Sequence, residues 1–336
     1  MFIIENYSLA ILFCIVTMLC WGSWGNTQKL AGKTWRYELF YWDYTIGILI
    51  FAVIMAFTLG SIGDSGRSFI EDIQQIEGGN ILNAFIGGVI FNASNILLSA
   101  SVSIAGMAVA FPLGVGLALV LGVFINYFST PKGDPALLFI GVALIVIAII
   151  CNGIASGKNN RSGVANPNVK KGILLAAVAG VLMSFFYRFV ASAMDLNNFE
   201  SPTNGLAIPY TAFFIFATGI FISNFLFNTF VMKKPFVGEK VTYKQYFSGK
   251  FGTHLVGIFG GCIWALGTLF SYIAAGKAGA PISYALGQGA PMIAALWGVF
   301  IWKEFTKGNK SVNRLLTIMF LFFLAGLSLI VLSGGN

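Results

Sequence analysis

Long apolar runs, separated by short polar stretches, recur along all 336 residues of the chain. A helix needs about 20 mostly apolar residues to cross the hydrocarbon of a bilayer. Ten segments meet this requirement, approximately residues 9–28, 40–60, 81–103, 107–128, 135–156, 172–194, 206–232, 254–275, 281–302 and 315–332. The connections between them leave no room for a soluble catalytic domain. The pattern therefore predicts an all-α integral membrane protein with ten transmembrane helices that contact the lipid bilayer.

Composition and charge support this interpretation. Only 10% of the residues are charged and 57% are hydrophobic, which is too little charge to cover a soluble globule of this size. The net charge of +8 is unevenly distributed, because sixteen of the 20 Lys and Arg residues lie in the connections after spans one, five, seven and nine. By the positive-inside rule these connections are cytoplasmic and both termini lie outside. The excess therefore indicates orientation and not a nucleic-acid partner.

The two halves of the chain share a pattern of small residues. A shift of 173 residues places Gly87-Gly88 on Gly260-Gly261, and the segment "GVFI" at residue 122 recurs at residue 298. These matches predict two five-helix repeats, residues 1–157 and 172–336, joined by a cytoplasmic linker, 158–171. Because five is odd, the two copies have opposite orientations, as in many secondary transporters, whose substrate sites lie near the bilayer midplane. Channels and scaffolds need no such symmetry.

Polar side chains form stripes on several predicted helices. On span three, Asn92 and Asn95 share one face, and Thr268 and Tyr272 occupy the corresponding face of span eight, with Trp264 beside them. Side-chain amides in hydrocarbon are costly unless partnered. We therefore expect these groups to face either a cavity or a neighbouring helix.

The first span ends in "CWGSWGNTQK", residues 20–29. On a helical wheel Trp21, Trp24 and Gln28 share a stripe and Asn26 continues the arc, so this face suits a cavity, although the tryptophans also fit an interfacial belt. Glycines and prolines in spans four and nine predict kinked or interrupted helices. The candidate substrate-binding residues are Trp21, Trp24, Asn26, Gln28, Asn92, Asn95, Tyr187, Arg188, Trp264, Thr268, Tyr272, Tyr284 and Gln288.

Few charges lie inside the predicted spans. Asp43, near the cytoplasmic end of span two, is the candidate proton-coupling residue, because a buried carboxylate that binds and releases a proton is a usual coupling device. A fixed salt bridge to Lys29 is the alternative. Arg188, in the outer third of span six, can pair with Asp195 on the same face.

Nothing in the sequence suggests an enzyme. The four cysteines have no paired spacing, no metal-ligand cluster or nucleophile constellation is present, and the single histidine, His254, lies at a span boundary where an interfacial role is the simpler interpretation. We therefore expect neither a metal nor a cofactor.

The ten-span plan and the glycine-rich fourth and ninth spans resemble the drug/metabolite transporter superfamily. Within it, "CWGSWG" and the segment "GGCIWALGTLFSYIAAGKAGAPISYALGQGAPMIAALWGVFIWKEF" resemble the sugar-uptake branch of glucose/ribose uptake proteins and the rhamnose/proton symporter. The motif "YWDYTIG" is similar to plant ureide permeases. Those proteins carry a nucleotide-binding-like motif in the central loop, whereas "GKNNRSGVANPNVKK" lacks GxxxxGK[ST] spacing, so we expect no ATP binding.

Together these observations predict a multi-pass protein of a cell membrane, expected to be a bacterial inner membrane. Its predicted function is import of a small neutral polar metabolite, most simply a sugar, by alternating access with proton coupling. The import direction is implied by the resemblance alone. The alternatives are a ureide or nucleobase permease of the same fold, a drug/metabolite exporter, and a membrane scaffold or sensor that transports nothing.

Overall fold

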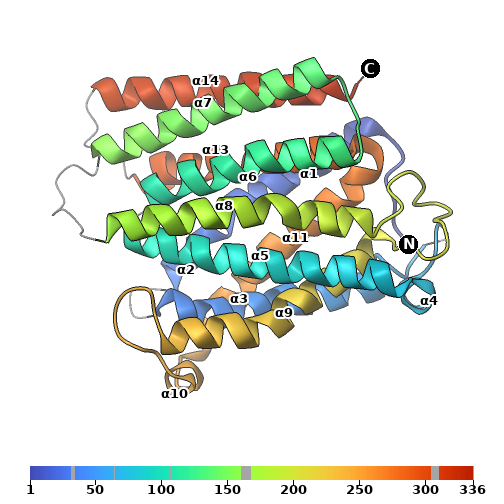
Figure 1. Cartoon of the computed structure of the whole chain (residues 1–336), viewed down its shortest axis with the longest axis horizontal. Helices are drawn as coiled ribbons and strands as arrows, with labels where there is room; N and C mark the ends of the chain where they lie inside the picture. The colour runs from blue at the N-terminus through green and yellow to red at the C-terminus, as the bar shows by residue number, and fades with distance from the viewer. Residues whose placement is uncertain (32–34, 64, 106, 160–167, 304–309, 336) are drawn as a thin grey trace.

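The helices of the protein run side by side along one long axis (Figure 1). The computed structural model describes residues 1–31, 35–63, 65–105, 107–159, 168–303 and 310–335. The helices are α1 (Tyr7–Ser23), α2 (Gly25–Leu30), α3 (Tyr37–Phe57), α4 (Phe69–Gln75), α5 (Gly78–Ala105), α6 (Met107–Ser129), α7 (Pro135–Asn159), α8 (Val169–Ser192), α9 (Pro209–Lys233), α10 (Tyr243–Phe247), α11 (Phe251–Ala278), α12 (Ala280–Gly287), α13 (Ala290–Leu296), the π-helical turn η1 (Trp297–Ile301) and α14 (Lys310–Ser333).

The prediction of an all-α membrane protein is confirmed for the described residues. Nine helical segments in this part of the chain are long and apolar enough to cross a membrane, with α1 and α2 forming one of them and α12, α13 and η1 another. The apolar part of α6, Leu113–Ser129, is shorter. The count of ten spans therefore stays a prediction.

The two ends of the helix bundle differ in what they carry. Both chain termini and α4 lie at one end, and α2 and α10 lie at the opposite end (Figure 1). We call these the terminal end and the basic end, because Lys29 in the last turn of α2 and Lys244 in α10 lie at the latter. The alternation of basic connections predicted from charge, and the orientation in a membrane, stay predictions.

Glycines let two pairs of helices approach closely. A Cβ atom on Gly261 of α11 would lie 2.1 Å from the carbonyl oxygen of Tyr44 on α3. A Cβ atom on Gly88 of α5 would lie 2.1 Å from the carbonyl oxygen of Phe216 on α9. Gly88 and Gly261 are 173 positions apart, and Tyr44 and Phe216 are 172 positions apart, which matches the shift between the two halves of the sequence. The packing of α3 on α11 therefore corresponds to the packing of α9 on α5.

Two of the predicted spans are broken. The first divides into α1 and α2 at Trp24, and the ninth divides into α12 and α13 at Gln288 and Gly289, where interruption was expected. The fourth span is one helix, α6, although Pro112 lies within it.

An aromatic and amide cavity as the candidate functional site

A cavity lies between α1, α2, α5, α11 and the break between α12 and α13. It has an outer chamber of about 720 Å³ and an inner chamber of about 520 Å³, and both volumes include open space outside the protein. Four residues, Trp21, Trp24, Asn95 and Leu98, line both chambers. The two chambers therefore adjoin, and the segment "CWGSWGNTQK" supplies much of the wall between them.

The outer chamber opens at the basic end. Its lining includes Asn26 and Lys29 of α2, Val102 near the end of α5, and Trp302 just after η1. The Trp302 indole N–H donates to Asn26 Oδ1 at 2.6 Å, and the Lys29 Nζ lies 4.6 Å from the centre of the Trp302 ring. These contacts form a polar rim in which Lys29 is the cationic group among the described lining residues.

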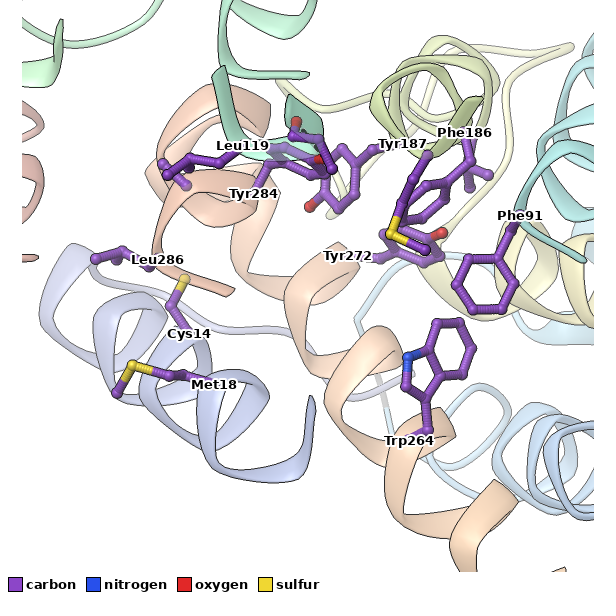
Figure 2. Close-up of a cluster of buried hydrophobic side chains, with 14 of the residues drawn as sticks. Cys14, Met18, Phe91, Leu119, Phe186, Tyr187, Trp264, Tyr272, Tyr284 and Leu286 are labelled. Atoms are coloured by element: carbon purple, nitrogen blue, oxygen red, sulfur yellow. Dashed lines mark hydrogen bonds between the residues drawn. The ribbon is translucent and has the colours of Figure 1, made fainter. Parts of the chain in front are cut away.

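Aromatic rings form the walls of the inner chamber. The Trp21 and Trp264 rings are nearly parallel, with centroids 6.3 Å apart and an interplanar angle of 9°. Phe91 stacks on Trp264 with ring centroids 4.3 Å apart, and Figure 2 shows the two rings next to each other. The Trp21 Nε1 donates to Thr268 Oγ1 at 3.0 Å, which fixes the orientation of the indole. Such rigid flat faces suit a planar or flat-faced ligand.

Amide side chains provide the polar groups of the inner chamber. Asn95 donates from Nδ2 to the Tyr41 hydroxyl at 3.2 Å. Gln288 lies at the break between α12 and α13 and is 5% exposed. The lining of the inner chamber contains no Asp, Glu, Lys or Arg among the described residues. The chamber is therefore polar without being charged.

Tyrosine and serine side chains close the bundle between the inner chamber and the terminal end. The Tyr187 hydroxyl lies 2.9 Å from Ser271 Oγ and donates to Ser283 Oγ at 3.2 Å. Tyr284 donates to the Ala118 carbonyl at 2.9 Å. Figure 2 shows Tyr187, Tyr272 and Tyr284 gathered beyond Phe91 and Trp264. The cavity is thus open toward the basic end and closed toward the terminal end.

The structure brings together only part of the predicted substrate-binding set. Trp21, Trp24, Asn26, Gln28, Asn95, Trp264 and Gln288 line one or both chambers. Thr268 holds Trp21, whereas Tyr187, Tyr272 and Tyr284 belong to the closed region. The remaining two, Asn92 and Arg188, lie outside the cavity lining.

Asn92 contacts a neighbouring helix, which was the expected alternative to the cavity, and Arg188 lies at the surface. Asn92 is fully buried and donates from Nδ2 to Ser223 Oγ on α9 at 2.9 Å. Around the axis of α5 its side chain is offset by about 60° from that of Asn95, and this offset turns Asn92 toward α9. Arg188 is exposed on α8. Its predicted pairing with Asp195 is wrong: Asp195 accepts from the Thr203 N–H at 2.9 Å and the Thr203 hydroxyl at 2.8 Å.

The hydrogen bonds to Asp195 also affect its ionisation. Burial alone would raise the pKa of this carboxyl group, but the N–H and hydroxyl of Thr203, with further backbone N–H groups, outweigh burial and lower the pKa. Asp195 is therefore a structural anion of the connection between α8 and α9.

Asp43 lies outside the cavity, at the basic end of α3. It is 1% exposed and accepts hydrogen bonds from Trp35 Nε1 at 3.2 Å and the Tyr246 hydroxyl at 2.7 Å, and its Oδ1 lies 2.7 Å from His254 Nδ1. The alternative of a fixed salt bridge to Lys29 is wrong, since the ion-pair partner of Asp43 within the described residues is His254. Burial, and then the hydrogen bond and charge of Asp43, raise the pKa of Tyr246, which keeps this hydroxyl a donor.

The contact of His254 with Asp43 was missed because the position of the histidine at a span boundary favoured an interfacial role. One signal was available: it lies in the first turn of α11, at the same predicted cytoplasmic face as Asp43. No group of three His, Cys, Asp or Glu residues placed to hold a metal ion occurs within the described ranges.

Comparison with known proteins decides the family. A sequence model of the ureide permease family matches residues 40–163 and 158–333. The chain belongs to the ureide permease family. Ureide permease 1 of Arabidopsis thaliana is 24% identical over 394 aligned positions, covering 100% of both chains, and the glucose uptake protein GlcU of Bacillus subtilis is 25% identical over 318, covering 92% of each.

A solved crystal structure shares the fold of this permease. It superposes with a TM-score of 0.63 at 16% sequence identity, over 98% of this chain and 99% of the other. The family relationship makes the protein a multi-pass membrane transporter of small metabolites, and a permease is not an enzyme. Its relatives come from plants as well as bacteria.

Proposed function

We propose that this permease transports a small, neutral, planar nitrogen-rich solute of the ureide type, and that the cavity is its binding site. The observation that carries the proposal is the inner chamber, where the stacked Trp21 and Trp264 rings lie beside the amides of Asn95 and Gln288. The names of the relatives, such as Ureide permease 1, support the same substrate class over the sugar expected first from the sequence.

The chemistry of the chamber fits such a solute. A ureide has a flat face, which can stack on indole rings, and an edge of alternating N–H and C=O groups. Side-chain amides of Asn and Gln offer both donors and acceptors to that edge. Because the described lining of the inner chamber carries no charged side chain, a charged solute would lose its hydration without a counter-ion.

The difference between the two ends of the cavity supports transport by alternating access. The structure is open at the basic end and closed at the terminal end, which is one of the two states that alternating access requires. The second state would arise by motion of one five-helix repeat against the other. The matching glycine contacts of Gly261 on Tyr44 and Gly88 on Phe216 support the repeat. With the basic end in the cytoplasm, the described state faces inward, and import is coupled to protons through Asp43.

A sugar is the second candidate substrate. GlcU of Bacillus subtilis, named a glucose uptake protein, aligns with 92% of the chain. Indole faces also stack on the C–H faces of sugar rings, and amides bind hydroxyl groups, so the chamber chemistry is compatible with both classes.

The proposal is tested by uptake competition in proteoliposomes of the purified protein. Radiolabelled allantoin, a ureide, is taken up by counterflow in the presence of excess unlabelled allantoin, uracil, glucose or ribose. We expect allantoin to compete fully and the two sugars to have little effect, with protein-free liposomes as the control. Full competition by glucose or ribose would favour the sugar candidate, and absence of allantoin counterflow would contradict the proposed substrate class.

A further inference from the structure

We propose that Asp43 and His254 together form the proton-binding site of the transporter, and that contact between Tyr44 and Trp24 connects this site to the cavity. The proposal rests on the proposed transport function and assigns its coupling to specific atoms. His254 takes a role that the position of a lone histidine at the end of a span did not suggest.

Hydrogen bonds hold both oxygens of the Asp43 carboxyl group. Oδ2 accepts from the Trp35 indole N–H, and Oδ1 accepts from the Tyr246 hydroxyl. Oδ1 also lies 2.7 Å from His254 Nδ1, a ring nitrogen that can either donate or accept a hydrogen bond. The proton of this contact can therefore reside on Asp43 or on His254.

His254 provides a route for the proton between water and Asp43. Its side chain is 19% exposed at the basic end, and its ring is held edge-on by Trp35 at 5.0 Å and Tyr246 at 4.8 Å. A proton from Asp43 Oδ1 can pass to Nδ1 while Nε2 releases its own proton to water, which leaves a neutral imidazole with a proton on Nδ1. The reverse steps load Asp43, so each transfer moves one proton and conserves charge.

Other ionisable groups nearby are already engaged. From α11 and α10 the groups facing Asp43 are His254 and Tyr246, and Trp35 precedes α3. Arg36 hydrogen-bonds Glu38 through Nε at 3.1 Å, away from Asp43. Protonated His254 is therefore the cationic group that forms an ion pair with Asp43 within the described residues.

The proton site and the substrate cavity are mechanically connected. Tyr44, the next residue after Asp43, packs its ring on Trp24 at a centroid distance of 4.8 Å. Trp24 lines both chambers of the cavity. A Cβ atom on Gly257 of α11, one turn after His254, would lie 2.4 Å from Asp43 Cβ, so α3 and α11 are in close contact at this point.

Further along α11 the same helix contacts the cavity wall. A Cβ atom on Gly260 would lie 2.2 Å from Thr27 Oγ1, and Thr27 donates to the Trp24 carbonyl at 2.6 Å. Movement of α11 against α3 therefore changes both the hydrogen bonds of Asp43 and the position of Trp24. Loss of the His254 and Tyr246 bonds in the outward-open state would favour protonation of Asp43 there.

The test separates transport from coupling in proteoliposomes. Counterflow of radiolabelled allantoin at equal pH on both sides measures transport, and accumulation of allantoin under an imposed pH gradient measures coupling. For Asp43→Asn we expect gradient-driven accumulation to be lost while counterflow continues. For His254→Gln we expect accumulation to be slower, and the rate of accumulation no longer to depend on the pH at the basic end. Absence of counterflow in the wild type would instead contradict the proposed function.

Two tyrosines of α10 give a matched control. Tyr246→Phe removes a hydrogen bond to Asp43, whereas Tyr243→Phe removes a hydrogen bond to Thr229. We expect Tyr246→Phe to shift the pH dependence of accumulation and Tyr243→Phe to leave it as in the wild type. Gradient-driven accumulation that survives in Asp43→Asn, or equal pH profiles for wild type, His254→Gln and Tyr246→Phe, would overturn the proposal.

Discussion

Gly287, at the end of α12, sets the position of the Trp21 indole in the cavity wall. A Cβ atom at this position would lie 2.7 Å from Trp21 Cζ3 and 3.1 Å from Cε3. We predict that Gly287→Ala weakens substrate binding by displacing this indole.

The size of the effect follows from the contact distances. Carbon atoms in contact lie about 3.5–4.0 Å apart, so the indole must retreat by roughly 1 Å. The Trp21 Nε1 lies 3.0 Å from Thr268 Oγ1, and a retreat of that size breaks the hydrogen bond. Its loss costs about 0.5–1.5 kcal/mol, which corresponds to about two- to tenfold in affinity when the indole orientation contributes to binding.

Gly25 provides the matched control, because it lines the outer chamber and a Cβ atom there meets nothing within 4 Å. The half-saturation concentration for allantoin counterflow is measured for the wild type, Gly287→Ala and Gly25→Ala. We expect an increase for Gly287→Ala and a value near that of the wild type for Gly25→Ala. Equal values for all three, or a larger effect at Gly25, would refute the assignment of Trp21 to the binding site.

Two further predictions concern stability. Gly261→Ala forces α3 and α11 apart and should lower the unfolding temperature of the detergent-solubilised protein by several degrees, as expected for about 1–3 kcal/mol of overpacking. Gly252→Ala should leave the unfolding temperature unchanged, because a Cβ atom there meets nothing within 4 Å. Equal shifts for the two variants would contradict the close contact. The lowered pKa of Asp195 stabilises the fold at pH values above its unfolded pKa of about 3.9, and this contribution is lost as pH falls through the folded pKa. Asp195→Asn should therefore reduce the acid sensitivity of unfolding, and an unchanged acid limb would show that the Thr203 hydrogen bonds do not contribute.

The sequence predicted those features that depend on local patterns. The apolar segments identified the spans, and the glycines and prolines around Gln288 identified the break in the ninth. The helical stripe of Trp21 and Trp24 indicated a cavity-lining face, because a stripe needs only the period of one helix. These positions line the cavity in the structure.

The features that were missed depend on contacts between distant segments. Asn92 and Asn95 lie on similar faces of α5, and only the position of α9 shows that Asn92 binds Ser223 instead of lining the cavity. Asp43 and His254 are 211 residues apart, and their contact requires the close packing of α3 on α11. A sequence pattern within one helix carries no information about which neighbour a side chain meets.

Accessibility of the cavity during substrate binding tests the central claim most directly. Ser99→Cys places a thiol in the outer chamber, in a background in which the half-buried Cys151 and Cys262 are replaced by serine. The measurement is the rate of labelling by a membrane-impermeant maleimide, applied from each side, with and without allantoin. The account predicts labelling from the side of the basic end and slower labelling with allantoin. Labelling from the opposite side alone, or a rate unaffected by allantoin and slowed by glucose, would contradict it.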